Sequence, residues 1–458
     1  MFESVVILLL LFTGGFLTLR TRFFSIRHPI KVARALVGNL LRPPQQDCTG
    51  RTITPFQAMS TTLAGTLGVG SISGIATAIT LGGPGSIFWM WVSAFFGMTT
   101  KYAEIVLAVH FSSPSDRTGG PMIYLKKGLS SPFLACFFCV CCVAASFGIG
   151  GMVQSNAIAQ ALDFSFGVPG FVTGCVFTLL AAFVILGGIQ RIARFSEKLV
   201  PTMSLCYFIL AIIAILRHSS QIPAVFTQIF SQAFSVRAAA GGVFGSAAFY
   251  ALRYGVSRGI FSNEAGLGSS PIAHTCTAQK SPAREGVLGI FEVFIDTFVM
   301  CTLTALVILT SGIADCGLDA SALVGAAFGV SFGSFGEMFV SISIVFFAFS
   351  SILGWCFYAE QCLRHLFQNA YYPILFYRMA LLFSVMLGAV LKLQVVWGIA
   401  DCFNMAMAIP NLIGLLGLSS LVVLETKRYF APQSIRKISH SRRIRFPAKG
   451  CAPMKHGN

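Results

Sequence analysis

Charged side chains are scarce in this sequence. They make up 10% of the 458 residues, whereas hydrophobic residues make up 55%. A soluble domain usually has about 25% charged residues, and the mean hydropathy here is +0.78. The composition therefore excludes an ordinary soluble enzyme. It predicts a polytopic membrane protein, and the length allows roughly ten to twelve spanning helices.

Motifs for nucleotide and metal chemistry are also missing. The sequence contains no G-x-x-x-x-G-K-[ST] and no H-E-x-x-H, so nothing indicates ATP-driven pumping or a zinc hydrolase. Four of the 14 cysteines cluster in one apolar run at 136–142, with no histidine nearby. We interpret them as small buried apolar residues rather than as metal ligands. The sequence also lacks a filter loop of the kind that would indicate a channel. We expect neither an enzyme nor a cofactor.

Long apolar runs predict an all-α protein with eleven membrane spans. The first run, which has only Glu3 as an early charge, is interpreted as an uncleaved span rather than a signal peptide. The expected spans lie at about 4–19, 56–80, 85–109, 133–160, 168–187, 199–216, 241–267, 286–313, 335–358, 374–391 and 396–424.

The basic residues predict the orientation of these spans. If the N-terminus is outside, 26 of the 32 Lys and Arg residues fall in cytoplasmic segments and only three in outer loops. Cytoplasmic loops of membrane proteins carry this excess. The net charge of +16 is therefore explained without a nucleic-acid partner. We expect a cell (inner) membrane protein with a cytoplasmic C-terminus, and a basic tail at 425–458 that lies against anionic lipid.

The number of spans indicates an internal repeat. Without the first span and its basic loop (1–55), ten spans remain, which divide into two sets of five at 56–216 and 241–424. Because five is odd, the second set starts from the opposite side of the membrane. This is the condition for an inverted-topology repeat, which is common in secondary transporters.

The first span of each set has features that interrupt helices. Residues 61–79 read TTLAGTLGVGSISGIATAI, with four glycines and six hydroxyl side chains, and residues 241–270 read GGVFGSAAFYALRYGVSRGIFSNEAGLGSS. Glycines at this density also suit close helix packing. Two interrupted helices in matching positions, however, are the best sequence pointer to a transport site, because unpaired backbone groups in hydrocarbon need a ligand.

Several segments resemble the alanine or glycine:cation symporter family of sodium/alanine symporters. Among them are GGPMIYLKKGL (119–129), FGIGGMVQSNAIA (147–159), FSNEAGLGSSPIAHT (261–275) and SSILGWCFYAEQ (350–361). The resemblance covers most of 56–425. It implies a leucine-transporter-like fold of five plus five helices with one extra N-terminal helix. It also implies sodium-coupled uptake of small neutral amino acids: alanine, glycine and, in some members, D-alanine.

The resemblance also implies a site. A sodium ion would bind backbone carbonyls near Gly65 and Gly68 together with the hydroxyls of Ser350 and Ser351, because hard oxygen ligands suit this cation. For the substrate carboxylate we expect N–H groups around Gly68, Gly70 and Ser71. The amine and side chain of the substrate are expected to contact Gln154, Phe261, Ser262, Asn263 and Trp355.

Ionisable residues within spans are candidates for function. Asp296 is the strongest for a second cation or a proton, although a buried structural acid is an equal alternative. We expect Glu264 to pair with Arg258. The family commonly reads GTGNI where this chain reads GVGSI at 68–72. Ser71 has a shorter reach than Asn, so a proton-coupled permease of the same fold stays open as an alternative.

Overall fold

The structure is a computed structural model. It describes residues 2–40, 54–112, 119–185, 189–235, 247–277, 281–318, 320–368 and 370–430. Most of the predicted basic tail at 425–458 lies outside the described residues, as do the first residues of the span expected at 241–267.

The described residues form helices joined by short turns. In chain order these helices are α1 (Phe2–Arg20), α2 (Phe24–Arg27), α3 (Pro29–Leu40), α4 (Pro55–Thr66), η1 (Val69–Ser71), α5 (Ser73–Gly82), α6 (Ser86–Phe111), α7 (Pro121–Lys127), α8 (Pro132–Ala145), η2 (Ser146–Met152), α9 (Val153–Phe166), α10 (Gly170–Ile185), α11 (Ile189–Arg217), η3 (Ser219–Gln221), α12 (Ile222–Ala233), α13 (Ala247–Asn263), α14 (Pro271–His274), α15 (Pro282–Val293), η5 (Phe294–Cys301), α16 (Thr302–Thr310), α17 (Ala320–Phe332), α18 (Ser334–Leu366), α19 (Tyr371–Val390), α20 (Leu393–Gly417) and α21 (Ser419–Phe430).

The helices are long and apolar enough for a membrane protein. Within the described ranges, eight helical segments have the length and composition to cross a bilayer, and Ser73–Gly82, Gly170–Ile185 and Ala320–Phe332 are shorter apolar helices. The outer helices expose large apolar side chains, such as Leu179 at 72% and Phe376 at 77%. Water would disfavour such surfaces, whereas lipid suits them. The fold is that of an all-α, multi-pass membrane protein.

The helix ends follow from local sequence. Thr54 caps α4 by accepting a hydrogen bond from the Gln57 N–H, and the Gln57 side chain accepts one from the Thr54 N–H. Together they form a capping box, with Pro55 at the first helical position. Gly167, at a φ of 64°, ends α9 in the left-handed conformation that glycine adopts without strain.

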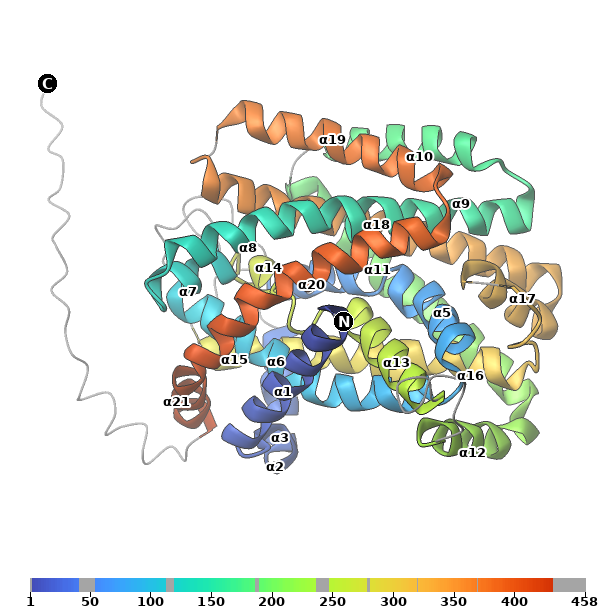
Figure 1. The fold of residues 1–458 in the computed structure, drawn as a ribbon, viewed down its shortest axis with the longest axis horizontal. Helices are drawn as coiled ribbons and strands as arrows, with labels where there is room; N and C mark the ends of the chain where they lie inside the picture. The colour runs from blue at the N-terminus through green and yellow to red at the C-terminus, as the bar shows by residue number, and fades with distance from the viewer. Residues whose placement is uncertain are drawn as a thin grey trace, which may run out of the picture.

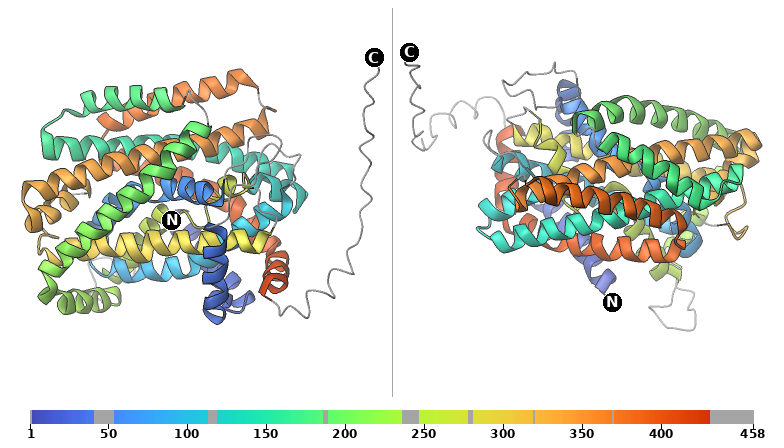
Figure 2. Two further views of the ribbon diagram at one scale, coloured as in Figure 1. Left: turned by 180° about the vertical axis from the view of Figure 1, so that it is seen from behind. Right: turned by 90° about the horizontal axis from the view of Figure 1, so that it is seen from above.

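The long helix α18 runs through the bundle, where it packs against α4, α9, α11 and α17 (Figure 1). Helices α10 and α19 lie side by side at one edge, and α11 crosses the opposite face diagonally (Figure 2). Helix α6 packs closely on both α13 and α15. Glycine makes one of these approaches possible, because a Cβ at Gly255 of α13 would overlap the backbone of Ser86.

Candidate site between two interrupted helices

The first interruption lies between α4 and α5. Helix α4 ends at Thr66, and the chain then makes the single 3-10 turn η1 before α5 starts at Ser73. Gly68, at φ −101° and ψ −148°, is outside the helical region. All residues from Ala58 to Ile79 are buried. The helix expected at 56–80 is therefore interrupted inside the protein.

The second interruption lies between α13 and α14, at 264–270. Three residues here have positive φ: Glu264 at 56°, Gly266 at 92° and Gly268 at 82°. Such a conformation is unusual for glutamate and easy for glycine. Gly255 and Gly259, in contrast, lie inside α13 and serve close packing against α6.

The two interruptions touch. A Cβ on Gly70 would lie 2.9 Å from the Ser262 Cα, so the first interruption rests directly on the end of α13. The hydroxyls of Ser71 and Ser262 are 3.0 Å apart. Both donate to Asp296 Oδ1, at 2.6 and 2.8 Å. The structure therefore brings together three of the residues expected at the site, Ser71, Ser262 and Asp296.

Asp296 is the acidic centre of this contact. It is fully buried, and its second oxygen accepts a hydrogen bond from Thr297 Oγ1 at 2.9 Å. It lies in the π-helical segment η5. A π-helical turn rotates side chains relative to an α-helix and occurs often at functional sites. Asn263, also expected at the site, donates from Nδ2 to Thr297 Oγ1 at 3.1 Å.

The serines of α18 lie against the end of α4. Ser351 Oγ donates to the Ala64 and Gly65 carbonyls, at 2.7 and 3.3 Å. Ser350 Oγ is 3.5 Å from the Ala64 carbonyl, and 2.8 Å from the Phe347 carbonyl of its own helix. The Gly68 Cα faces the Ser351 hydroxyl so closely that a Cβ there would overlap it. Hydroxyl and carbonyl oxygens thus converge at this point.

Gln154 joins a second π-helical segment to the first interruption. It follows η2, its Nε2 donates to the Ile149 carbonyl at 3.0 Å, and its Oε1 accepts from the Val69 N–H at 3.4 Å. Trp355, fully buried on α18, packs against Gly150, where a Cβ would lie 2.5 Å from the Trp355 Cβ.

The aromatic residues near α13 form a layer with an ion pair. Phe261 packs on Trp397 of α20, with ring centroids 4.5 Å apart. The Arg258 guanidinium lies 4.1 Å from the Trp397 ring centroid and pairs with Asp401 at 2.5 Å. The expected pairing of Arg258 with Glu264 is therefore wrong, because α20 supplies a closer carboxylate.

A buried charge cluster, whose pairings our sequence reasoning did not predict, connects both interrupted helices. Lys101 Nζ donates to the Asn263 carbonyl at 2.9 Å, the last carbonyl of α13, and pairs with Glu292 at 3.2 Å. Glu292 Oε1 accepts from Thr62 of α4 at 2.5 Å and contacts His274 Nε2 of α14 at 2.8 Å. One carboxylate thus connects the first half of one interrupted helix to the second half of the other.

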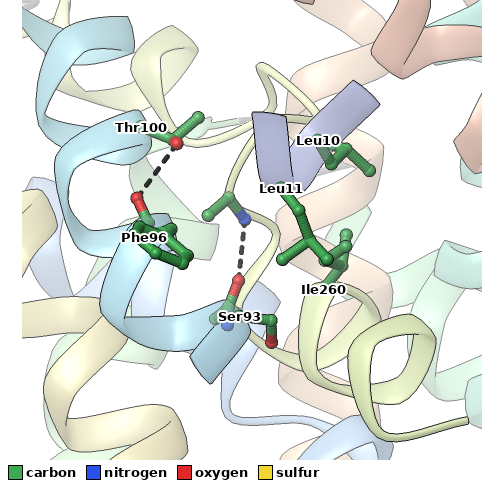
Figure 3. Close-up of a pocket in the computed structure, with 9 residues that line it drawn as sticks. Leu10, Leu11, Ser93, Phe96, Thr100 and Ile260 are labelled. Carbon is green, nitrogen blue, oxygen red and sulfur yellow. Dashed lines mark hydrogen bonds between the residues drawn. The ribbon is translucent and has the colours of Figure 1, made fainter. Parts of the chain in front are cut away.

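A small pocket lies beside the second interruption. It is lined by residues of α1, α6 and the end of α13, with Leu10 and Leu11 of α1 on one side and Phe96 and Thr100 of α6 on the other (Figure 3). Next to it, a Cβ on Gly266 would overlap the Leu10 side chain. The first helix therefore packs directly against the flank of the interruption.

Comparison with known proteins identifies the family of this chain. A model of the sodium:alanine symporter family matches residues 1–442. The chain belongs to this family. The resemblance noted from the sequence is confirmed. Because the family and its named relatives are transporters, the expectation that the chain is not an enzyme is confirmed as well.

Two relatives illustrate the range of the family. The sodium/alanine symporter AgcS of Methanococcus maripaludis is 42% identical over 434 residues, covering 92% of this chain and 93% of the relative. The probable sodium/glutamine symporter GlnT of Bacillus subtilis is 36% identical over 434 residues, covering 94% of this chain and 88% of the relative.

Among solved structures, the manganese transporter of Eremococcus coleocola has a similar fold. The TM-score is 0.53 at 13% sequence identity, and the match covers 88% of this chain and 86% of the transporter. At this identity the similarity concerns the fold alone. It supports the all-α fold of a polytopic membrane protein.

Proposed function

We propose that this family member is a sodium-coupled symporter that imports small neutral amino acids by alternating access. Alanine and glycine are the expected substrates, and D-alanine belongs in the same panel. The observation that carries the proposal is the contact of two interrupted helices within the bundle. Gly70 packs against Ser262, and the hydroxyls of Ser71 and Ser262 both donate to Asp296.

The proposed architecture is two inverted repeats of five spans, at 56–216 and 241–424, preceded by one extra span. In support, each repeat begins with an interrupted helix that is followed by a long helical segment: α6 follows α5, and Pro282–Thr310, which starts with α15, follows α14. Helices α6 and α15 pack against each other. We further propose an outside N-terminus and a cytoplasmic C-terminus, in line with the distribution of Lys and Arg.

The proposed sodium site uses the Ser350 and Ser351 hydroxyls with the carbonyls at the end of α4. Ser351 already contacts the Ala64 and Gly65 carbonyls, and Gly68 lies against it. The last carbonyls of a helix lack helical partners and carry the negative end of its dipole. A small cation that accepts oxygen ligands suits this position.

The proposed substrate site adjoins the sodium site, because a Cβ on Gly68 would meet both Ser351 and Gln154. Backbone N–H groups around Gly68, Gly70 and Ser71 would bind the carboxylate, since a helix start provides such donors. The remaining contacts would come from the residues that surround this segment, which are Gln154, Phe261, Ser262, Asn263 and Trp355. The bulk of Trp355 and Phe261 would exclude large side chains and so favour alanine and glycine.

A second candidate is a proton-coupled permease of the same fold. Asp296 favours it, because a fully buried carboxylate with three hydroxyl donors can hold either a proton or a second cation.

Uptake of labelled alanine into proteoliposomes with imposed gradients separates the two candidates. We expect an inward sodium gradient at equal pH to drive accumulation. Uptake that ignores sodium and follows a pH gradient would refute sodium coupling and favour the proton-coupled alternative. Competition by glycine, D-alanine and glutamine would then rank the substrates.

A further inference from the structure

Negative charge is in excess around the two interruptions. Lys101 is the shared cationic neighbour of several buried acids there. Five carboxylates and two basic groups, all at most 1% exposed, lie in this region: Glu104, Glu264, Glu285, Glu292 and Asp296, against Lys101 and His274. Even a protonated His274 leaves the acids in the majority. Uncompensated charge in a low-dielectric interior is strongly disfavoured, so either a proton on one of the acids or an additional cation would stabilise this region.

The Glu264 carboxylate is one of three acids here, with Glu104 and Glu285, that have an oxygen with no hydrogen-bond or ion-pair partner among the described residues. Its Oε2 accepts a hydrogen bond from Ser269 Oγ, whereas its Oε1 has no hydrogen-bond partner among the residues that the structure describes. In contrast, Glu292 has Lys101, His274 and Thr62, and Asp296 has three hydroxyls. Glu264 also follows the last residue of α13 directly, where the negative end of the helix dipole repels a second negative charge.

Two further buried polar groups with incomplete contacts lie beside Glu264. Within the described part of the chain, Tyr358 Oη and Trp355 Nε1 also have no hydrogen-bond partner, and both residues are fully buried. A Cβ on Gly65 would lie 3.2 Å from Tyr358 Oη and 3.6 Å from Glu264 Oε1. The Trp355 and Tyr358 rings are 5.8 Å apart, and Trp355 lies near the Glu264 carboxylate.

The position of this group matters for transport. Glu264 belongs to the second interruption, Gly65 to the last turn of the first interrupted helix, and Tyr358 and Trp355 to α18. The three side chains therefore meet where both interrupted helices and the serine-bearing helix α18 converge. Buried polar atoms without partners are rare and each one is costly, so several at one point indicate a polar ligand.

We propose that Glu264 Oε1, together with Tyr358 Oη, binds a monovalent cationic group during the transport cycle. The inference rests on the proposed function and deepens it. The Glu264 oxygen without a partner and the Tyr358 hydroxyl beside it suit an ammonium group, so the ammonium group of the substrate is the first source of the charge. The coupling sodium ion is the second source.

The strained backbone agrees with a functional role. Glu264 has a φ of 56°, a left-handed conformation that is strained for a non-glycine residue. Ser269 fixes its second oxygen. The chain thus holds this carboxylate in one orientation, with Oε1 directed at the first interrupted helix.

The test compares the full-length wild type with Glu264→Gln and Tyr358→Phe, purified in detergent. Asp163→Asn is the matched control, because Asp163 is an exposed acid at the end of α9. Two dissociation constants are measured by tryptophan fluorescence: that of alanine at saturating sodium, and that of sodium without alanine. Competition by lactate, which keeps the carboxylate but lacks the ammonium group, is measured alongside.

If Glu264 binds the ammonium group, Glu264→Gln weakens alanine binding by about tenfold or more, as expected for a lost charge-assisted hydrogen bond. It also reduces the preference for alanine over lactate, and it leaves sodium binding unchanged. If Glu264 binds sodium, Glu264→Gln weakens sodium binding instead. Tyr358→Phe weakens binding of the same ligand as Glu264→Gln does, by a smaller factor, and Asp163→Asn changes neither dissociation constant.

Unchanged alanine and sodium constants in Glu264→Gln would overturn the proposal. Should that variant fail to fold, unchanged constants in Tyr358→Phe would overturn it equally. The proposed function is tested separately, because sodium-driven uptake by the wild type does not depend on which residue binds the ammonium group.

Discussion

Gly68 offers the sharpest test of the sodium site. It faces Ser351 so closely that a Cβ would overlap the Ser351 hydroxyl and lie 3.2 Å from Gln154 Oε1. Its φ of −101° is accessible to alanine, so the effect of Gly68→Ala comes from the contact and not from the backbone. The added methyl group must displace Ser351 away from the Ala64 and Gly65 carbonyls.

The expected magnitude follows from packing. Overpacking a well-filled interior by one methyl group costs roughly 1–3 kcal/mol. If this cost destabilises only the sodium-bound state, sodium affinity falls by about 5- to 150-fold. The assay is alanine uptake into proteoliposomes over a range of sodium concentrations, and the readout is the half-saturating sodium concentration.

Gly74→Ala is the matched control. Gly74 lies six residues further along the same glycine-rich stretch, inside α5, and a Cβ there would meet Trp397 at an ordinary 3.7 Å. In a helix, alanine is favoured over glycine by up to ~1 kcal/mol, so this variant should transport like the wild type. Equal half-saturating sodium concentrations in the Gly68 and Gly74 variants would refute the assigned sodium site.

Three further substitutions have defined outcomes. Asp296→Asn keeps the shape of the side chain but removes the charge to which Ser71 and Ser262 donate. We expect the half-saturating concentration of the coupling cation to rise by at least about tenfold, measured by uptake at varied sodium concentration and at varied pH. Glu292→Gln leaves Lys101 buried without its ion partner, which should lower the free energy of unfolding by about 3–5 kcal/mol and is measured as a fall in melting temperature. Gly255→Val would collide with the backbone of Ser86, and separation of α13 from α6 should reduce both the yield of folded protein and its melting temperature.

Controls and contrary outcomes for these three are simple. Gly398→Ala on α20 meets nothing within 4 Å and should leave the melting temperature unchanged. A melting temperature of Glu292→Gln equal to that of the wild type would show that the buried ion pair is not needed for the fold. Unaltered sodium and pH dependence of Asp296→Asn would assign Asp296 a structural role.

The interruptions could be predicted from sequence because their cause is local. The glycines and hydroxyls of 61–79 weaken an α-helix and tolerate non-helical backbone, and the structure interrupts the helix between Thr66 and Ser73. In the second stretch, only two of the glycines, Gly266 and Gly268, lie in the break with positive φ, together with Glu264. Gly255 and Gly259 look the same in the sequence but pack inside α13, so the boundary could not be placed from composition.

The charge pairs could not be predicted because their partners are far apart in the chain. Arg258 pairs with Asp401, 143 residues away, and Lys101 reaches the Asn263 carbonyl, 162 residues away. Glu264, although only six positions from Arg258, follows the end of α13 with a left-handed backbone and accepts a hydrogen bond from Ser269 instead. A lysine within an apolar run, as at 101, is the sequence signal that could have pointed to the buried cluster.

The most direct test of the central claim is the effect of sodium on alanine binding by the purified protein. If the two interrupted helices hold the ion and the substrate side by side, each must increase the affinity for the other. We predict that the alanine Kd falls as sodium replaces an inert cation such as choline, and that Gly68→Ala shifts this dependence to higher sodium while Gly74→Ala does not. An alanine Kd that stays the same with and without sodium would contradict the account.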